Sequence, residues 1–359
     1  MPLPKPGKRA AALGAALLLL ALIPVVVESS YALHLFIALF SAIALGGAWN
    51  VIGGFGGQYS VGHAAYFGLG AYASMILFQR YQVPPWYGTW LGMALAVVVA
   101  WVIGSITFRL RGPYFVLASI AVAEILRLTA LNWKSMTNAA EGILSRDVPP
   151  LVLGPLPPIE FNTKVPYYYM GLSLAVIALG TNLLVKRSRL GYWLQAIRED
   201  QDAAWSLGIP PTKIKNTGLM ISAALTALVG GFTALYTGFI DPPGVLGMEI
   251  SVQIVLTCII GGVGTVAGPA LGALVLVSLS EALRTNLLAS GLFALGVPEQ
   301  SAVGFFLREN LAHAHVLVYG VLVVVVILFM PEGVLGFVTR RLARRVKLAA
   351  AAPAAGAAR

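Results

Sequence analysis

The sequence predicts an all-α, polytopic transmembrane bundle of about ten helices, and three observations carry that prediction. Apolar residues make up 58% of the 359 residues and charged residues only 11%, against about 45–50% and about 25% in an ordinary soluble domain. The apolar residues form runs long enough to cross a bilayer as helix, which takes about 20 residues. Positive charge collects in alternate connections between these runs. This balance excludes a soluble enzyme and a disordered scaffold, and a single cysteine, Cys258, excludes a disulfide-rich secreted module.

Ten apolar segments are expected to span the membrane. They lie near 11–27, 34–52, 57–78, 89–108, 113–133, 167–185, 216–240, 249–261, 266–288 and 315–331. The chain is thus divided into a tail (1–10), a transmembrane domain (11–338) and a basic, then Ala-rich tail (339–359). The first span also resembles a signal peptide, but its apolar stretch is long and no clear cleavage site follows, which favours a retained helix. The region 249–288 can be divided in more than one way.

The distribution of basic residues predicts the orientation of the spans. With the N-terminus inside and ten alternating spans, most Lys and Arg fall on the inner side, in 1–10, 109–111, 186–215 and 339–359. This is the bias of the positive-inside rule. We therefore expect a multi-pass protein of a bacterial inner membrane with both termini in the cytoplasm. The net charge of +10 is then a topology signal, and nucleic acid is not an expected partner.

The longest inner loop, 186–215, is predicted to contain a short amphipathic helix. Its apolar residues fall near one side of a helix of 3.6-residue period, at Leu194, Ile197, Ala204, Trp205 and Leu207. Gly208 can end this helix in the left-handed conformation, and Pro210 and Pro211 stop it from continuing. Its polar side includes acidic residues, which favours a protein partner over a lipid surface. The alternative is a surface helix that only connects two spans.

The same loop resembles the EAA loop of ABC importer permeases. Asp202-Ala203-Ala204 followed by Gly208 fits the pattern, with Asp in place of the usual Glu and without the usual Ile-x-Leu-Pro ending. In that family the loop is a coupling helix that docks on the ATPase subunit. The resemblance implies an ATPase-coupling role for Glu199, Asp200, Asp202, Ala203, Ala204 and Gly208.

Longer motifs narrow the resemblance to LivM-type permeases, the membrane subunits of branched-chain amino acid ABC importers. The main motif is 50–72, NVIGGFGGQYSVGHAAYFGLGAY. Further matching stretches follow in order, at 109–115, 123–127, 189–200, 261–269 and 331–336. Together they cover about 35–337 and imply the ABC importer permease fold.

The resemblance also implies partners and a cargo. The partners are a second homologous permease, two ATPase subunits and an extracytoplasmic substrate-binding protein, with membrane lipid around the bundle. Whether the two permeases are identical is left open. The segment 137–143 departs from the family pattern, so urea or another amide is an alternative to a branched-chain amino acid as cargo.

The chain carries no recognisable catalytic, cofactor or metal motif. It lacks the P-loop that cradles ATP phosphates and the H-E-x-x-H zinc motif. Ser60 and His63 have no orienting carboxylate nearby in the sequence, and His313 and His315 are more typical of a solvated pair than of a metal site. We expect a transport subunit that is not an enzyme, with ATP hydrolysed on another subunit.

Two glycine-rich stretches, 53–57 and 261–264, are candidates for the translocation path. Glycine suits helix breaks that line a cavity, although it also permits close helix packing, and both interpretations stay open. The candidate path residues are Gln58, Tyr59, Ser60, His63, Tyr66, Gly261, Gly262 and Gly264.

Two pairs of charged residues lie inside predicted spans, Glu124 with Arg127 and Glu281 with Arg284. The three-residue spacing allows each pair to neutralise itself on one helix face. The pairs can anchor the bundle, dock a binding protein or act as a gate. No unpaired carboxylate is evident at mid-membrane, which argues against an ion-coupled secondary transporter. A structural membrane protein without any path is the other alternative class.

Overall fold

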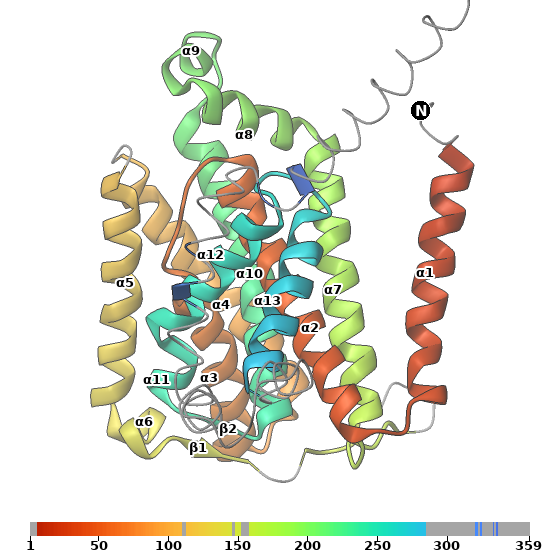
Figure 1. Ribbon diagram of the computed structural model, residues 1–359. Helices are drawn as coiled ribbons and strands as arrows, with labels where there is room; N and C mark the ends of the chain where they lie inside the picture. The colour runs from red at the N-terminus through yellow and green to blue at the C-terminus, as the bar shows by residue number, and fades with distance from the viewer. Residues whose placement is uncertain are drawn as a thin grey trace, which may run out of the picture.

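The computed structural model describes residues 6–109, 113–145, 148–151 and 158–284, together with 320, 321, 324, 333, 335 and 336. Long helices run side by side through these ranges (Figure 1). They are α1 (Pro6–Val26), α2 (Ser30–Trp49), α3 (His63–Tyr81), α4 (Pro85–Thr107), α5 (Pro113–Asn132), α7 (Lys164–Arg187), α10 (Pro211–Thr237), α12 (Met248–Gly261) and α13 (Gly268–Arg284).

Six stretches in the described residues are long and apolar enough to cross a membrane. They are Ser30–Phe55, Pro85–Thr107, Tyr114–Asn132, Lys164–Arg187, Pro211–Thr237 and Pro242–Gly261, with shorter apolar helices at Gly14–Val26 and Gly268–Ala282. The chain is therefore an all-α membrane bundle. Each predicted span up to 266–288 overlaps one long helix. The span predicted at 315–331 lies almost wholly outside the described residues, so the number of ten stays a prediction.

Short elements gather at the two ends of the bundle (Figure 1). One end carries α6 (Lys134–Thr137), η2 (Ala139–Glu141), β1 (Ile143–Leu144), β2 (Phe239–Ile240) and α11 (Pro242–Leu246). The other end carries α8 (Arg189–Glu199) and α9 (Gln201–Ser206). We refer to them as the β1–β2 end and the α8–α9 end.

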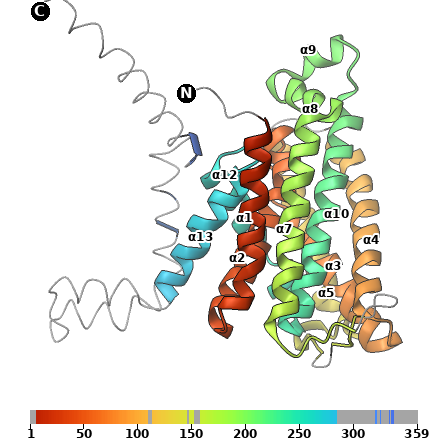
Figure 2. The ribbon, with the colours of Figure 1, turned by 90° about the vertical axis from the view of Figure 1, so that its right-hand side faces the viewer.

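Helix α10 is the centre of the bundle. It packs against α4, α3 and α2, and 72% of its spanning window is buried, compared with 22% for α4 and for α5. Glycines bring α10 and α3 into backbone contact: a Cβ at Gly70 would lie 1.9 Å from the Ala227 carbonyl oxygen, and one at Gly230 would lie 2.0 Å from that of Phe67. Such small residues are the usual means of close helix approach in membranes. Figure 2 shows α4 and α13 at opposite edges of this centre.

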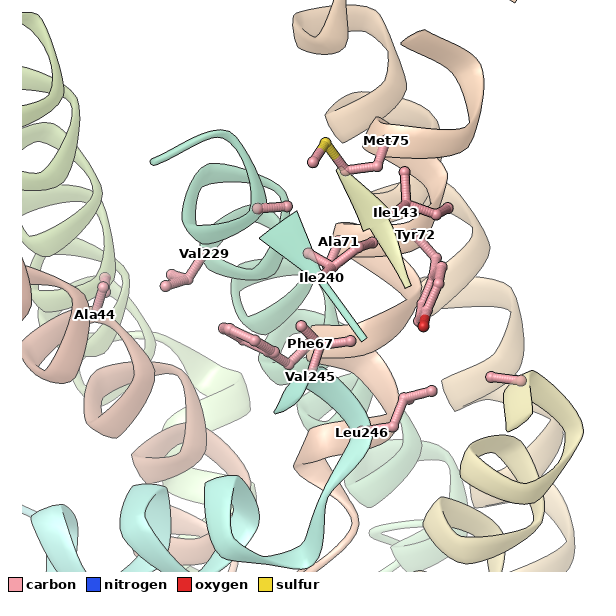
Figure 3. Close-up of a cluster of buried hydrophobic side chains, with 13 residues drawn as sticks. Ala44, Phe67, Ala71, Tyr72, Met75, Ile143, Val229, Ile240, Val245 and Leu246 are labelled. Atoms are coloured by element: carbon pink, nitrogen blue, oxygen red, sulfur yellow. The ribbon is translucent and has the colours of Figure 1, made fainter. Parts of the chain in front are cut away.

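A buried apolar cluster includes the strand pair at the β1–β2 end (Figure 3). Strands β1 and β2 pair antiparallel, with Ile143 opposite Ile240. Both isoleucines are buried and belong to the same cluster as Met75 and Phe67 of α3. The pairing satisfies the backbone groups of two connections, and the cluster holds those connections on α3.

Helix α1 attaches to α7 through two tyrosine hydroxyls. Tyr168 donates to the Leu20 carbonyl at 2.6 Å and Tyr169 donates to the Ala21 carbonyl at 3.0 Å. Pro24 lies inside α1, four residues after Leu20, and proline has no N–H to give to that carbonyl. The Tyr168 hydroxyl therefore supplies the hydrogen bond that the helix cannot make.

Candidate functional site

A cavity of about 380 Å³ lies in the half of the bundle nearest the β1–β2 end. Ligand sites in proteins have volumes of roughly 300–1,000 Å³. Its walls come from α2, α10, α11, α12 and α13, together with Phe67 of α3. Because these helices are distant in sequence, only the folded bundle creates the cavity.

The lining of the cavity combines aliphatic, hydroxyl and acidic groups. Its apolar members include Leu35, Leu45, Val245, Ile250, Ile254 and Val277, and its polar members include Ser41, Thr233, Thr237, Gln253, Thr257 and Ser280. Two carboxylates, Asp241 and Glu281, and the imidazole of His34 complete the wall. This set suits a small amphiphile with an aliphatic body and a cationic group.

The two carboxylates have different surroundings. Glu281 accepts hydrogen bonds from Arg284 at 2.7 and 3.1 Å, and the Tyr31 hydroxyl also donates to it. The pair thereby joins the end of α13 to the start of α2. Asp241 has no cation within 4.0 Å among the described residues, so its charge is the one more available to a ligand.

The other intramembrane pair lies away from the cavity. Arg127 donates to Glu124 at 2.5 and 2.8 Å on the peripheral helix α5. Neither residue lines the cavity. The contact satisfies both charges within one helix, which is what a charge facing an apolar environment requires.

The side of the cavity toward the α8–α9 end is blocked by buried side chains, which we call the floor. Trp49, Ile254 and Cys258 form one buried cluster, against which the cavity residues Leu45 and Ile250 pack. Just beyond it, α2 continues as a π-helical turn, η1 (Asn50–Phe55). Asn50, the first residue of this turn, is fully buried, as are the residues of α2 just before it.

Asn50 connects the floor to three other elements. Its amide nitrogen donates to Asn182 of α7 at 2.8 Å and to the Thr265 carbonyl at 2.9 Å. Its amide oxygen accepts from Gly264 N–H at 2.9 Å and from the Cys258 thiol at 3.2 Å. Asn182 in turn donates to the Gly47 and Ala178 carbonyls. We call these five residues the Asn50 network: Asn50, Asn182, Cys258, Gly264 and Thr265.

The predicted path residues lie around the floor, and none of them lines the cavity. His63 bonds to Ser222 at 2.7 Å, and Ser222 donates to the Ala48 carbonyl at 2.7 Å. The Ser60 carbonyl accepts from Trp49 at 2.7 Å, and Ser60 and Tyr66 border a separate, much smaller space. The Gln58 side chain donates to the Gly56 carbonyl and its backbone N–H donates to the Ile52 carbonyl, while Tyr59 packs on Trp49.

The glycines of the second stretch make close contacts. A Cβ at Gly261 would lie 1.8 Å from the Gly268 carbonyl oxygen. Gly262 and Gly264 have φ of +120° and +76°, which side chains rarely adopt. The turn between α12 and α13 therefore requires glycine for its own geometry, and a role of this stretch in the path stays a prediction.

The loop 186–215 forms two helices instead of the single predicted one. Asp200 is extended, with φ −153° and ψ 111°, and its carboxylate accepts from Asp202 N–H at 2.9 Å and Ala203 N–H at 3.0 Å. Such an N-cap starts α9 and interrupts the periodicity. Leu194, Ile197 and Ala204 are buried as expected, but Trp205 and Leu207 are 67% and 82% exposed. The break turns these two side chains away from the bundle.

The predicted coupling residues other than Ala204 lie at the exposed tip of this arm. Glu199 and Asp202 are exposed, and Gly208 ends α9 with φ +85° as predicted. Ala204 packs with Leu194 and Ile197 in a buried cluster that includes Val51 and Phe55 of η1. The arm therefore shares a buried cluster with η1, which continues α2 beyond the floor.

The cavity residues were largely missed by sequence reasoning. Gln253 is a polar residue inside the apolar stretch Pro242–Gly261 and Asp241 directly precedes it, and a polar residue within a span is a usable signal for a functional site. Among the described residues, no group of three or more His, Cys, Asp or Glu side chains could hold a metal ion.

A membrane-crossing bundle with a mixed cavity in one half and a helical arm on the other end is the architecture of a membrane transport subunit. The comparison with known families agrees with this class. Residues 30–330 match the family described as branched-chain amino acid transport system, permease component, and the chain belongs to that family.

Individual relatives carry corresponding names. The chain is 29% identical over 265 residues to the high-affinity branched-chain amino acid transport system permease protein LivM of Salmonella typhimurium, and 28% identical to LivM of Escherichia coli. Both alignments cover 67% of this chain and 61% of the relative. It is 24% identical to LivH of Escherichia coli, over 83% of this chain and 91% of the relative. No solved structure matches.

Proposed function

We propose that the chain is the membrane-spanning permease subunit of an ATP-driven importer for branched-chain, hydrophobic amino acids. The single observation that supports this best is the cavity, where aliphatic walls and the Asp241 carboxylate meet the two parts of such a molecule. Membership of the permease family and the names of the relatives support the same cargo. The chain spans about three fifths of the LivM relatives, so the cargo is carried over as a proposal.

The proposed orientation places the α8–α9 end in the cytoplasm of a bacterial inner membrane and the β1–β2 end outside. Both termini are then cytoplasmic, with ten spans that include 315–331. The basic residues around 186–215 support this orientation through the positive-inside rule. The cavity is then on the side from which an imported molecule arrives.

The proposed assembly contains a second homologous permease, two ATPase subunits and an extracytoplasmic binding protein. This chain hydrolyses nothing, because ATP is consumed on the ATPase subunits. The exposed Trp205 and Leu207 on α9 support docking of an ATPase at the α8–α9 end, since exposed apolar side chains beside a polar loop are typical of interfaces. The binding protein faces the β1–β2 end.

Uptake by the reconstituted complex tests this function. Proteoliposomes of the complete complex should accumulate leucine when ATP is enclosed in them. The complex consists of this chain, the second permease, the two ATPase subunits and the binding protein. Collapse of proton and sodium gradients should leave the rate unchanged. Urea accumulation in place of leucine would assign the amide cargo, dependence on an ion gradient would indicate a secondary transporter, and no uptake of either would contradict a transport role.

Substitutions in the arm test the coupling role. Gly208→Pro cannot adopt the φ of +85°, and Ala204→Asp would place a charge in the buried cluster with Leu194. We expect both variants to insert normally and to lose leucine uptake. Ser206→Ala, at an exposed position of the same helix, is the matched control. Normal transport by both variants would show that the arm does not couple ATP hydrolysis to uptake.

A further inference from the structure

Arg198 reaches from the arm to η1, and its side chain remains 42% exposed. It lies in the last turn of α8, one residue before that helix ends at Glu199. Its guanidinium donates to the Gly54 carbonyl of η1 at 2.8 Å. Its contact with the Glu199 carboxylate is long, at 3.8 Å, and Glu199 is largely exposed. The directed bond of Arg198 is therefore the one to η1, and a charged donor makes such a bond stronger than a neutral one.

Three glycines form the notch that admits this side chain. A Cβ at Gly57 would lie 2.6 Å from Arg198 Cγ, and a Cβ at Gly264 would lie 3.0 Å from Arg198 Nη1. A Cβ at Gly54 would lie 2.8 Å from the Gly264 backbone nitrogen. The two glycine-rich stretches thus meet each other, and the Arg198 side chain lies across both of them.

The notch is continuous with the floor of the cavity. Gly264 donates to Asn50, and Asn50 also accepts from Cys258. Cys258 is fully buried and follows Thr257, which lines the cavity. A single chain of contacts therefore leads from the arm, through Arg198 and the two turns, to the cavity wall.

We propose that Arg198 is a positioning residue, a latch that holds the floor closed by fastening α8 to the turns at 54–57 and 262–264. Displacement of the α8–α9 arm withdraws the guanidinium and frees both turns, which opens the floor between the cavity and the α8–α9 end. The role rests on the proposed function, because the ATPase subunits supply the displacement. A planar guanidinium suits a latch, since it fits a narrow notch and keeps its charge at all relevant pH values.

Cys258 is a natural reporter of the floor, because it is the only cysteine of the chain. We propose labelling the intact complex with N-ethylmaleimide, without cargo, and quantifying modification of Cys258 by mass spectrometry. Arg198→Ala should label about tenfold faster than wild type, as expected when one charge-assisted hydrogen bond no longer opposes opening. Arg198→Lys keeps a charged donor and should give an intermediate rate. Arg189→Gln, exposed at the start of α8, should label like wild type.

The same samples separate the latch from other roles. ATP hydrolysis by the Arg198→Ala complex should continue while leucine uptake falls at least about tenfold, which is uncoupling. If both Arg198 variants are labelled at the wild-type rate, the latch is overturned. The same holds if these variants also lose ATP hydrolysis, which would indicate that Arg198 contacts the ATPase instead. If the wild-type complex takes up leucine and the Arg198 variants are labelled at the wild-type rate, the latch is contradicted and the proposed function is not. Faster labelling in a complex that carries no leucine supports the latch and contradicts the proposed cargo.

Discussion

At the residue scale, one buried amide organises the interior of the protein. Asn50 has no side-chain exposure and bonds to groups from α7, α12 and the turn before α13. In an apolar interior an unpaired polar group is costly, so the network holds only if all its members are present. Asn50 stands where α2 passes into the π-helical turn η1, and its backbone N–H still donates to the Gly46 carbonyl of α2.

Removal of the Asn50 amide should destabilise the bundle strongly. Asn50→Ala leaves Gly264 N–H and the Thr265 carbonyl without a partner, and each orphan group costs roughly 1–3 kcal/mol. We expect a loss of about 3 kcal/mol in the free energy of unfolding, measured by denaturant titration in detergent. Asn132→Ala is the control, because Asn132 is exposed and bonds only to the Leu128 carbonyl of its own helix. Equal losses in the two variants would show that the network adds nothing.

At the scale of the element, helices are joined by backbone groups as much as by side chains. Four glycines each allow one helix to contact a backbone carbonyl of another, at Gly70, Gly230, Gly261 and Gly272. A Cβ at Gly272, for example, would lie 1.8 Å from the Thr257 carbonyl oxygen. A hydrogen bond that is missing in one helix can be supplied by another. Tyr168 of α7 donates to the Leu20 carbonyl of α1, which Pro24 leaves without a backbone donor. The bundle therefore depends on matched pairs of positions on neighbouring helices.

The pairing of Tyr168 with Pro24 predicts a coupled double-mutant cycle. Tyr168→Phe alone should cost about 1–2 kcal/mol, because the Leu20 carbonyl then has no donor. In the Pro24→Ala background residue 24 regains its N–H, so the same substitution should cost close to nothing, a coupling of about 1 kcal/mol. Unfolding titrations of the four proteins measure this coupling.

Tyr169→Phe provides the contrast for that cycle. The Ala21 carbonyl, which Tyr169 contacts, can also accept from the N–H of Val25 within α1. The loss of unfolding free energy caused by Tyr169→Phe should be small, and it should be the same with Pro or Ala at position 24. An unchanged cost of Tyr168→Phe in the two backgrounds would disprove the compensation.

At the scale of the whole molecule, the proposed function gives the two ends separate tasks. The half nearest the β1–β2 end holds the cavity, and the strand pair at that end packs on α3 (Figure 3). The α8–α9 end projects as an arm (Figure 1). The arm shares a buried cluster with η1 and a hydrogen bond with Gly54. Movement at one end can therefore reach the cavity without a flexible connection.

The acidic wall of the cavity predicts how cargo transfer responds to charge. Asp241→Asn removes the carboxylate that has no cation nearby among the described residues, and a charged hydrogen bond to an ammonium group contributes about 1.5–3 kcal/mol. Leucine uptake at limiting concentration should fall about tenfold or more. Glu160→Gln, an exposed carboxylate outside the cavity, should transport like wild type. Undiminished uptake by Asp241→Asn would remove Asp241 from the site.

The sequence by itself determined the membrane class, the position of the helices and the local breaks. Span positions follow from apolar runs, and helix ends follow from glycine and proline, as at Gly208. These features are local: bilayer thickness and backbone conformation act on neighbouring residues, so spacing along the chain reports them. The same locality explains why Glu281 could be matched with Arg284, three residues away in one helix.

Only the tertiary structure decided the cavity and the Asn50 network. Asn50 meets residues 132 and 214 positions away, and no periodicity encodes such contacts. The glycines of 53–57 and 261–264 were candidates for a path. That the two stretches contact each other follows only from the packing of α2, α12 and α13. The break at Asp200 is local by contrast, because its carboxylate accepts from N–H groups two and three residues further along the chain, and this contact competes with helix periodicity.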